Sequence, residues 1–265
     1  MSPNNPGLLA RILQQKRAEL PSLRARRLPA SEGPRSFSLR RVGGNLQLIA
    51  EIKFRSPSAG ALSTALSVSE RARAYQRGGA SMISVLCDTL FFDGAFTHLA
   101  EARAACDLPL LCKEFVIDES QLDAAVAYGA DAVLLIVRCL TAERLGQLTL
   151  AARERKLEPF VEVVSDEESK VALGAGATLI GVNARDLDTL VMDAARAARF
   201  LTNLPAATTR VHLSGIARLE DVERVAASAA DAALIGETLM REDQPEARLR
   251  ALVAAAGPVA GRAQA

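Results

Sequence analysis

The feature that most constrains this chain is an alternation of short apolar runs with helix-like segments, which begins at Leu46. The helix-like segments are about ten to fifteen residues long, a spacing typical of β-α-β units and a parallel sheet. Several runs are continuous stretches of Val, Ile and Leu, as expected for strands buried on both faces. The eight runs are Leu46–Ile52, Met82–Leu86, Leu108–Cys112, Ala132–Val137, Phe160–Val164, Thr178–Val182, Arg210–Leu213 and Ala232–Ile235.

The joints between these units repeat as well. Glycines precede the second, fourth and sixth runs, at Gly78-Gly79, Gly129 and Gly176, where a helix must stop and glycine accepts the left-handed cap conformation. Eight units in about 220 residues predict an α/β fold, a (β/α)8 TIM barrel with an N-terminal helical extension, for which about 250 residues is typical. The alternative is a doubly wound sheet, but its G-x-G-x-x-G fingerprint does not follow any of the runs.

The first part of the chain has a different pattern from the rest. Apolar residues between Leu8 and Leu13 recur at helical spacing, and prolines punctuate the segment that follows. We expect residues 1–45 to form a helix and an extended arm that pack on the barrel. The barrel itself is predicted for residues 46–255, and residues 256–265 are predicted to be a disordered tail.

Composition and charge bound the kind of protein this is. The 49% of hydrophobic and 24% of charged residues are typical of a globular chain, and no run reaches the ~18 apolar residues of a membrane span. The 32 Lys and Arg against 31 Asp and Glu lack the basic excess of a nucleic-acid binder. Four cysteines without a C-x-x-C spacing favour a reduced, cytoplasmic location. We expect a small-molecule substrate, no nucleic-acid or membrane partner, and a monomer or weak homo-oligomer.

Charged residues stand at the carboxyl ends of several runs, which form the active face of a TIM barrel. Glu51 and Lys53 share one face of the first strand, where the alternative to a catalytic role is a structural ion pair. Lys113 follows the third run, and two lysines at one mouth would form an anion site in which each lowers the other's pKa. Glu162 lies inside the apolar fifth run, where burial of a carboxylate implies a partner or a chemical task.

Polar or small residues follow the last three runs. Asn183 can donate or accept a hydrogen bond without carrying charge. Glycines after the seventh and eighth runs let backbone N–H groups approach a ligand, and these loops commonly bind phosphate in this fold. The residues in question are Ser214, Gly215, Gly236 and Glu237. No second ligand stands at metal-binding distance from His98 or His212, so no metal and no cofactor is implied, and acid–base chemistry on a small phosphorylated anion is predicted.

One segment resembles a family signature. Residues 49–58, IAEIKFRSPS, are similar to the E-x-K-x-x-S-P signature of the indole-3-glycerol-phosphate synthase family. Similar segments follow in the family's order, and the resemblance covers about residues 8–250. These segments are Ser84-Val85-Leu86, Phe91-Phe92, residues 113–118, Val161-Glu162-Val163, residues 183–187, Ser214-Gly215 and Gly236-Glu237.

The resemblance implies a carbon–carbon lyase of tryptophan biosynthesis. The family closes the ring of 1-(2-carboxyphenylamino)-1-deoxyribulose 5-phosphate with loss of CO₂ and water, which gives indole-3-glycerol phosphate. By resemblance, Lys113 would be the general acid of ring closure and Glu162 the general base of dehydration. Lys53 would bind the substrate carboxylate or phosphate, Glu51 and Asn183 would orient these groups, and the N-terminal helix and arm would lie over the barrel mouth. The residues that would bind phosphate or line its site are Ser56, Ser214, Gly215, Gly236 and Glu237.

One position of the expected site departs from the family pattern. Members usually carry Glu directly before the Ser-Gly of the seventh strand, and Leu213 stands there in this chain. Three hypotheses follow: an active synthase, a paralogue that acts on a related aryl-amino sugar phosphate, and a non-catalytic binding or scaffold protein. The retained set of charged residues at the strand ends favours the first.

Overall fold

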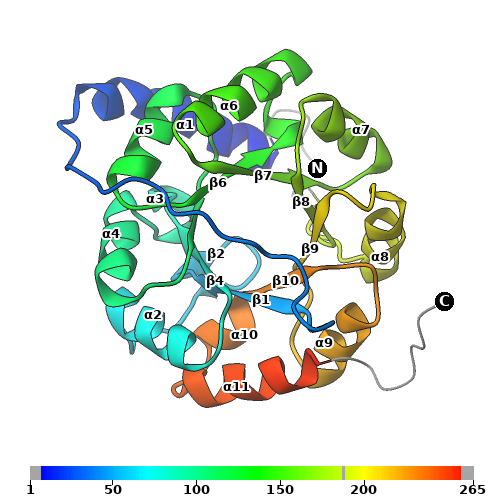
Figure 1. Cartoon of the computed structure of the whole chain (residues 1–265). Coiled ribbons are helices and arrows are strands. Elements are labelled where there is room, and N and C mark those ends of the chain that lie inside the picture. Colours follow the sequence, from blue (N-terminus) through cyan, green and yellow to red (C-terminus); the bar gives the residue numbers. More distant parts are fainter. Residues whose placement is uncertain (1–6, 187–188, 258–265) are drawn as a thin grey trace.

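Within residues 7–186 and 189–257, which the computed structural model describes, eight parallel strands close into a barrel surrounded by helices (Figure 1). The barrel strands are β1 (Gln47–Ile52), β4 (Met82–Leu86), β5 (Leu110–Lys113), β6 (Ala132–Ile136), β7 (Glu158–Val163), β8 (Leu179–Asn183), β9 (Thr209–Leu213) and β10 (Ala232–Ile235). They follow one another around the barrel in chain order, and β10 pairs with β1 to close it. The predicted TIM barrel is therefore confirmed.

The ends of the observed strands lie close to the predicted ones. Met82–Leu86 and Ala232–Ile235 have the predicted bounds, and the ends of the other strands lie within two residues of the predicted ones. The strand predicted from Leu108 begins at Leu110, because Pro109 has no N–H to donate to a neighbouring strand. The apolar runs therefore located the strands, and local hydrogen bonding decided their last residues.

Side-chain caps and glycines determine where the outer helices begin and end. The side chains of Ser67 and Ser165 each accept a backbone N–H from the first turn of the helix that follows. Gly79, Gly129 and Gly176 have φ values of 89°, 92° and 81°, so the predicted left-handed joints before β4, β6 and β8 are present. The outer helices are α2 (Val68–Arg77), α3 (Thr89–Phe92), α4 (Phe96–Ala105), α5 (Glu119–Ala127), a 3₁₀ turn (Val137–Cys139), α6 (Ala142–Glu154), α7 (Asp166–Gly174), α8 (Ala194–Asn203), α9 (Leu219–Ala226), α10 (Glu237–Met240) and α11 (Pro245–Ala255).

The barrel lumen is filled by one face of each strand. Ile49, Leu111 and Phe160 belong to this lumen cluster and are fully buried. The residue two positions further along each of these strands points to the same side, because side chains in a strand alternate. That position is occupied by Glu51, Lys113 and Glu162, respectively. The charged residues therefore stand on an apolar floor at the carboxyl end of the barrel.

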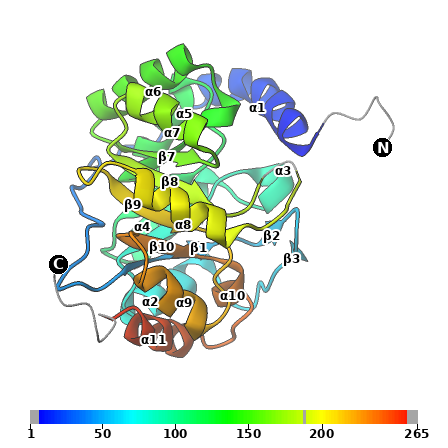
Figure 2. The same cartoon turned by 90° about the vertical axis from the view of Figure 1, so that its right-hand side faces the viewer.

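The N-terminal helix α1 (Leu8–Ala25) lies beside the carboxyl end of the barrel, as expected (Figure 2). Leu9 and Ile12 are buried on its inner side and join the lumen cluster. A small antiparallel hairpin of β2 (Arg55–Ser56) and β3 (Gly60–Ala61) lies at the same end. The mouth of the barrel is thus flanked by α1 and by this hairpin.

The arm that follows α1, residues 26–46, crosses the opposite end of the barrel (Figure 1). Leu39 is buried there and packs in the lumen cluster from below. The N–H of Arg35 donates to Asp131 at 2.7 Å, and the Arg41 guanidinium donates to the carbonyl of Ala230 at 2.8 Å. The expectation that the arm lies over the mouth is therefore wrong, because its hydrogen-bonding partners stand at the amino ends of β6 and β10.

The predicted division into residues 1–45, 46–255 and 256–265 stays a prediction. The arm and α1 precede the first barrel strand, and α11 ends at Ala255. Most of the tail, residues 258–265, lies outside the described residues. In the part of the chain that the structure describes, no helix has the length and apolarity needed to cross a membrane.

Candidate active site

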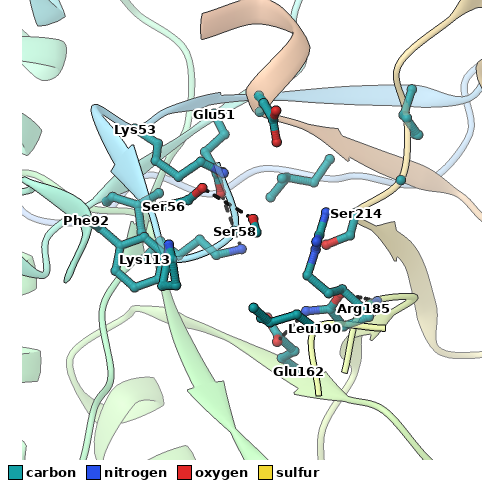
Figure 3. A pocket seen from close by; sticks show the side chains of 18 of the residues that line it. Glu51, Lys53, Ser56, Ser58, Phe92, Lys113, Glu162, Arg185, Leu190 and Ser214 are labelled. Carbon is teal, nitrogen blue, oxygen red and sulfur yellow. Dashed lines mark hydrogen bonds and ion pairs between the residues drawn. The ribbon is translucent and has the colours of Figure 1, made fainter. Parts of the chain in front are cut away.

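One cavity at the carboxyl end of the barrel has a volume of about 540 Å³ and is lined by every residue that the sequence predicted for the site. The side chains of Glu51, Lys53, Lys113 and Glu162 extend into it from three different strands (Figure 3). The residues that sequence analysis expected and that line this cavity are Glu51, Lys53, Ser56, Lys113, Glu162, Asn183, Ser214, Gly215, Gly236 and Glu237. Side chains more than a hundred residues apart in sequence are thus gathered around one space.

A carboxylate bridges the two lysines of the site. Glu51 is buried, and its Oε1 lies 2.6 Å from Lys53 Nζ while its Oε2 lies 3.3 Å from Lys113 Nζ. Burial alone would raise the pKa of Glu51, but attraction to the two ammonium groups outweighs it and lowers that pKa to about 2. Glu51 is therefore a fixed anion that orients both lysines, and it is too acidic to exchange protons near neutral pH.

The pKa of Lys113 differs from the sequence-based expectation. Burial would lower this pKa, but Glu51 and Glu162 attract the ammonium group and raise the pKa above its ordinary value. The prediction that the two lysines lower each other's pKa is wrong for Lys113, because two carboxylates lie within range of it. Lys113 is therefore a protonated donor at neutral pH.

Glu162 is held by an amide from the neighbouring strand. Asn183 Nδ2 donates to Glu162 Oε1 at 2.9 Å, and both side chains are buried. The other end of the amide is also fixed, since Asn183 Oδ1 accepts the N–H of Arg185 at 2.9 Å. One oxygen of Glu162 therefore has a defined donor, and its other oxygen is available on the side of the cavity.

Two glycines of the site make room for their neighbours. A Cβ on Gly236 would lie 2.5 Å from Glu51 Oε1, so only glycine leaves space for the bridging carboxylate. A Cβ on Gly215 would lie 2.5 Å from Met192 Cε, and both Gly215 and Ser214 have positive φ values, 78° and 70°. The left-handed conformation of Ser214, a non-glycine residue, marks a strained turn at the wall of the cavity.

The remaining predicted residues have local partners. Ser56 is buried in the hairpin, where its Oγ accepts the N–H of Ala59 at 3.1 Å. Glu237 at the start of α10 pairs with Arg241 at 2.9 Å. The Glu237 carboxylate therefore has a cation of its own, and it would repel a phosphate.

Several lining residues were missed by sequence reasoning. Arg185 extends into the cavity (Figure 3), although sequence analysis gave it no role. Its neighbour Asp186 pairs with Arg138 at 3.1 Å. The signal was present, because Arg185 stands two residues after Asn183 and so shares its side of the chain. The cations Arg241 and Arg248 at the rim carry no such sequence signal.

The cavity has an apolar wall in addition to its charged one. Side chains from α1 and from the strand ends form this wall, and the rings of Phe92 and Phe115 lie 5.9 Å apart. An aromatic ring of a ligand would be desolvated against these side chains. The apolar lining residues are Leu8, Leu9, Ile12, Leu86, Phe92, Phe115, Leu134, Ile136, Leu190, Ile216 and Leu234.

Leu213, the position that departs from the family pattern, lies in the lumen. Its side chain is 1% exposed and belongs to the lumen cluster with Phe160. Gly181 on the adjacent strand permits this packing, because a Cβ there would lie 2.7 Å from Leu213 Cδ1. Leu213 therefore fills apolar space at the position where the resemblance implied a Glu. Among the described residues, no three His, Cys, Asp or Glu side chains are grouped to hold a metal ion.

Comparison with known proteins agrees with this geometry. A family model described as indole-3-glycerol phosphate synthase matches residues 9–252. Indole-3-glycerol phosphate synthase 2 of Streptomyces coelicolor is 41% identical over 93% of this chain and 99% of that protein. The indole-3-glycerol phosphate synthase of Listeria monocytogenes serovar 1/2a is 40% identical over 92% and 97% of the two chains.

The solved structures that match show the fold alone. The 3-hexulose-6-phosphate synthase of Salmonella typhimurium superposes with a TM-score of 0.62 at 14% identity, over 80% of this chain and 98% of that one. Thiamine phosphate pyrophosphorylase of Pyrococcus furiosus superposes with a TM-score of 0.59 at 16% identity, over 81% and 96%. The family match over nearly the whole chain is more specific, and this chain belongs to the indole-3-glycerol phosphate synthase family.

Proposed function

We propose that this chain converts 1-(2-carboxyphenylamino)-1-deoxyribulose 5-phosphate into indole-3-glycerol phosphate, CO₂ and water. The observation that carries this proposal is the single cavity in which Lys53, Lys113 and Glu162 face an apolar wall. The substrate has matching parts: an aryl ring, a carboxylate, a carbonyl and a phosphate. The membership of the family supports the same reaction.

Lys113 is the proposed general acid of ring closure. In this step the aryl carbon that bears the carboxylate attacks the substrate carbonyl carbon, and Lys113 gives its proton to the carbonyl oxygen. The resulting ring intermediate loses CO₂, and the electron pair of the broken C–C bond restores the aromatic ring. Positioned proton transfer typically contributes about 10²–10⁴-fold to the rate. Glu51 supports this role because it holds the ammonium group of Lys113 in place.

Glu162 is the proposed general base of the dehydration. The hydroxyl formed in ring closure must leave as water while a neighbouring carbon loses a proton, so an acceptor and a donor are both needed. Glu162 can take the carbon-bound proton, and Lys53 or a reprotonated Lys113 can protonate the leaving hydroxyl. Asn183 fixes the orientation of Glu162 and can also hold a substrate hydroxyl.

The anionic ends of the substrate are assigned to the cations and to the glycine loops. We propose that Lys53 and Arg185 bind the carboxylate or the phosphate, because both line the cavity and both carry positive charge. Ser56, Ser214, Gly215 and Gly236 are proposed to line the phosphate site. Glu237 is proposed to contribute only its backbone N–H there, because its carboxylate pairs with Arg241.

The test is turnover of the carboxyphenylamino substrate by the purified chain, followed through the ultraviolet absorbance of the indole product. The wild type should form the product, and Glu162→Gln should lose most of the turnover, because the amide cannot accept the proton. Asp166→Asn, which changes a carboxylate at the start of α7, is the matched control and should retain wild-type turnover. Absence of the indole product with the wild type would contradict the proposal.

The paralogue hypothesis gains no support from the position of Leu213. Glu at this position would bury a carboxylate against Phe160 and Gly181, at a cost unless the lumen rearranges. We therefore expect Leu213→Glu to leave synthase activity no higher than the wild type. A higher activity would indicate that the chain is adapted to another aryl-amino sugar phosphate.

We also propose a cytoplasmic, monomeric or weakly homo-oligomeric enzyme that binds neither nucleic acid nor membrane. The absence of a C-x-x-C spacing among the four cysteines supports the reducing location.

A further inference from the structure

A second group of buried charges lies beside the proposed active site and takes no part in the chemistry described above. Lys16 of α1 is 2% exposed, and its Nζ lies 2.8 Å from Asp88 Oδ2 and 3.1 Å from Glu114 Oε1. Asp88 and Glu114 are themselves 0% and 2% exposed. The amine also contacts the half-exposed Glu19, one turn further along α1, at 2.9 Å. A lysine is almost never buried to this degree unless it is paired, so these contacts fix where its helix lies.

The two buried carboxylates stand at the ends of neighbouring barrel strands. Asp88 follows β4, and its side chain accepts the N–H of Phe91, which caps the short helix α3. Glu114 directly follows Lys113, and its Oε1 accepts the N–H of Phe115 at 2.6 Å. Lys16 therefore connects α1 to the segment that carries the proposed general acid.

The same helix supplies part of the apolar wall of the cavity. Leu8, Leu9 and Ile12 line the cavity, and Lys16 lies one turn beyond Ile12 on the same side of the helix. A second ion pair between α1 and the barrel joins Arg24, which is 58% exposed, to Asp118. An exposed pair of this kind contributes little to stability, whereas breaking a buried one is costly. The buried cluster is therefore the stronger of the two connections.

The balance of charge in the cluster shows how strongly it depends on Lys16. Burial and repulsion by Asp88 raise the pKa of Glu114 to about 7, against the attraction of Lys16. The groups that face Glu114 are Lys16 from α1 and Asp88 from the end of β4, with the Cys87 thiol beside them. Removal of the amine would leave two buried acids facing each other without a cation, and α1 would lose its buried ionic connection to the ends of β4 and β5.

We propose that Lys16 is a positioning residue of this enzyme, which fixes α1 over the mouth so that the aryl ring of the substrate is enclosed beside Lys113. The inference rests on the proposed function, since it assigns the α1 wall to the aryl part of that substrate. Lys16 acts through Asp88 and Glu114 and does not line the cavity itself. Its loss should therefore weaken substrate binding more than it slows the chemical step.

The experiment compares Lys16→Met with Arg24→Met in the full-length chain. Lys16→Met keeps the length of the side chain and removes the charge, and it should raise KM about tenfold or more with a smaller change in kcat. Hydrogen exchange should accelerate at the amides of residues 8–25 and stay unchanged in the barrel strands. Arg24→Met removes the exposed ion pair of the same helix and should leave KM and exchange within about twofold of the wild type.

A double variant separates the positioning role from a general loss of stability. Asp88→Asn retains a good helix-capping residue and removes the charge that faces Lys16. If Lys16 acts through Asp88, the KM of Lys16→Met with Asp88→Asn should equal that of Lys16→Met alone, because the shared contact is already lost. The double variant also has one fewer unpaired buried charge, so it should fold even where Lys16→Met does not.

Two results would overturn the inference. One is a KM of Lys16→Met within twofold of the wild type, and the other is exchange in α1 that matches Arg24→Met. The exchange measurement needs no turnover, so an inactive wild type would refute the proposed function, while unchanged exchange in Lys16→Met would refute the role of Lys16.

Discussion

The two ends of the barrel both contain buried charged residues, but they use them differently. At the carboxyl end, Glu51, Lys53 and Lys113 pair with one another and still face a cavity. At the amino end, Asp131 accepts the N–H groups of Leu110 and Arg35, both at 2.7 Å, and also pairs with the Arg103 guanidinium.

Asp231 repeats this arrangement before β10. Its carboxylate accepts the N–H of Arg210 at 2.9 Å, and Arg40 of the arm lies 3.6 Å away. Neither aspartate lines the cavity of the proposed active site. The two ends therefore differ in what their charged groups face: those at the carboxyl end face the cavity, whereas the aspartates at the amino end are occupied by backbone N–H groups and guanidinium groups of the protein itself.

The largest expected effect is at the mouth. Lys113→Met should lower kcat by about 10²–10⁴-fold, because the proposed proton donor is lost, while Glu51 keeps Lys53 as a partner. The unfolding temperature should change little. Steady-state kinetics and thermal unfolding of the same preparation measure both quantities. A kcat close to that of the wild type would show that Lys113 at the carboxyl end is not the proton donor.

At the amino end of the barrel, a substitution is expected to lower stability and to leave activity unchanged. Asp131→Ala should lower the free energy of unfolding by about 3–5 kcal/mol, because the half-buried Arg103 guanidinium and two backbone N–H groups lose a buried acceptor. Activity per folded molecule should stay at the wild-type value. Denaturant titration gives the first quantity and kinetics at low temperature the second. Asp123→Ala, which breaks an exposed pair with Arg155, serves as the control with an effect of about 0–1 kcal/mol.

The arm contains one buried and one exposed apolar residue, which together test how much its apolar packing contributes to stability. Leu39 is 2% exposed and Val42 is 69% exposed, although both belong to the arm. Leu39→Ala should cost about 2–5 kcal/mol of unfolding free energy through the cavity that it leaves, and Val42→Ala should cost less than about 0.5 kcal/mol. Equal effects of the two substitutions, measured by denaturant titration, would show that the arm does not close the amino end of the lumen.

The smallest expected effect is on the free energy of unfolding at acidic pH. The pKa of Glu51 is lowered to about 2 from an ordinary value of 4.5, so its ionised form favours the folded state. That contribution is fully present above pH 4.5 and is lost as the pH falls towards 2. The difference in unfolding free energy between the wild type and Glu51→Gln should therefore narrow over this range. A difference that stays constant or widens on acidification would show that the lysines do not stabilise the carboxylate.

Sequence could predict the barrel and the strand ends because both follow from local patterns. Alternation within a strand places Glu51 and Glu162 above the lumen residues. Glycine marks the helix–strand joints because it adopts the left-handed backbone conformation that each joint requires. The raised pKa of Lys113 could not be predicted, because it depends on Glu51 and Glu162 approaching from two other strands. The path of the arm was mispredicted for a similar reason, since its anchors Asp131 and Asp231 are acceptors whose position only the closed barrel defines.

The anchored arm limits how far α1 can move away from the barrel. It holds the C-terminal end of α1 within reach of the barrel at all times, because its far part is bound beneath the lumen. If α1 undocked, it would therefore remain tethered at that end, and its return would be an intramolecular event at an effective concentration in about the millimolar range.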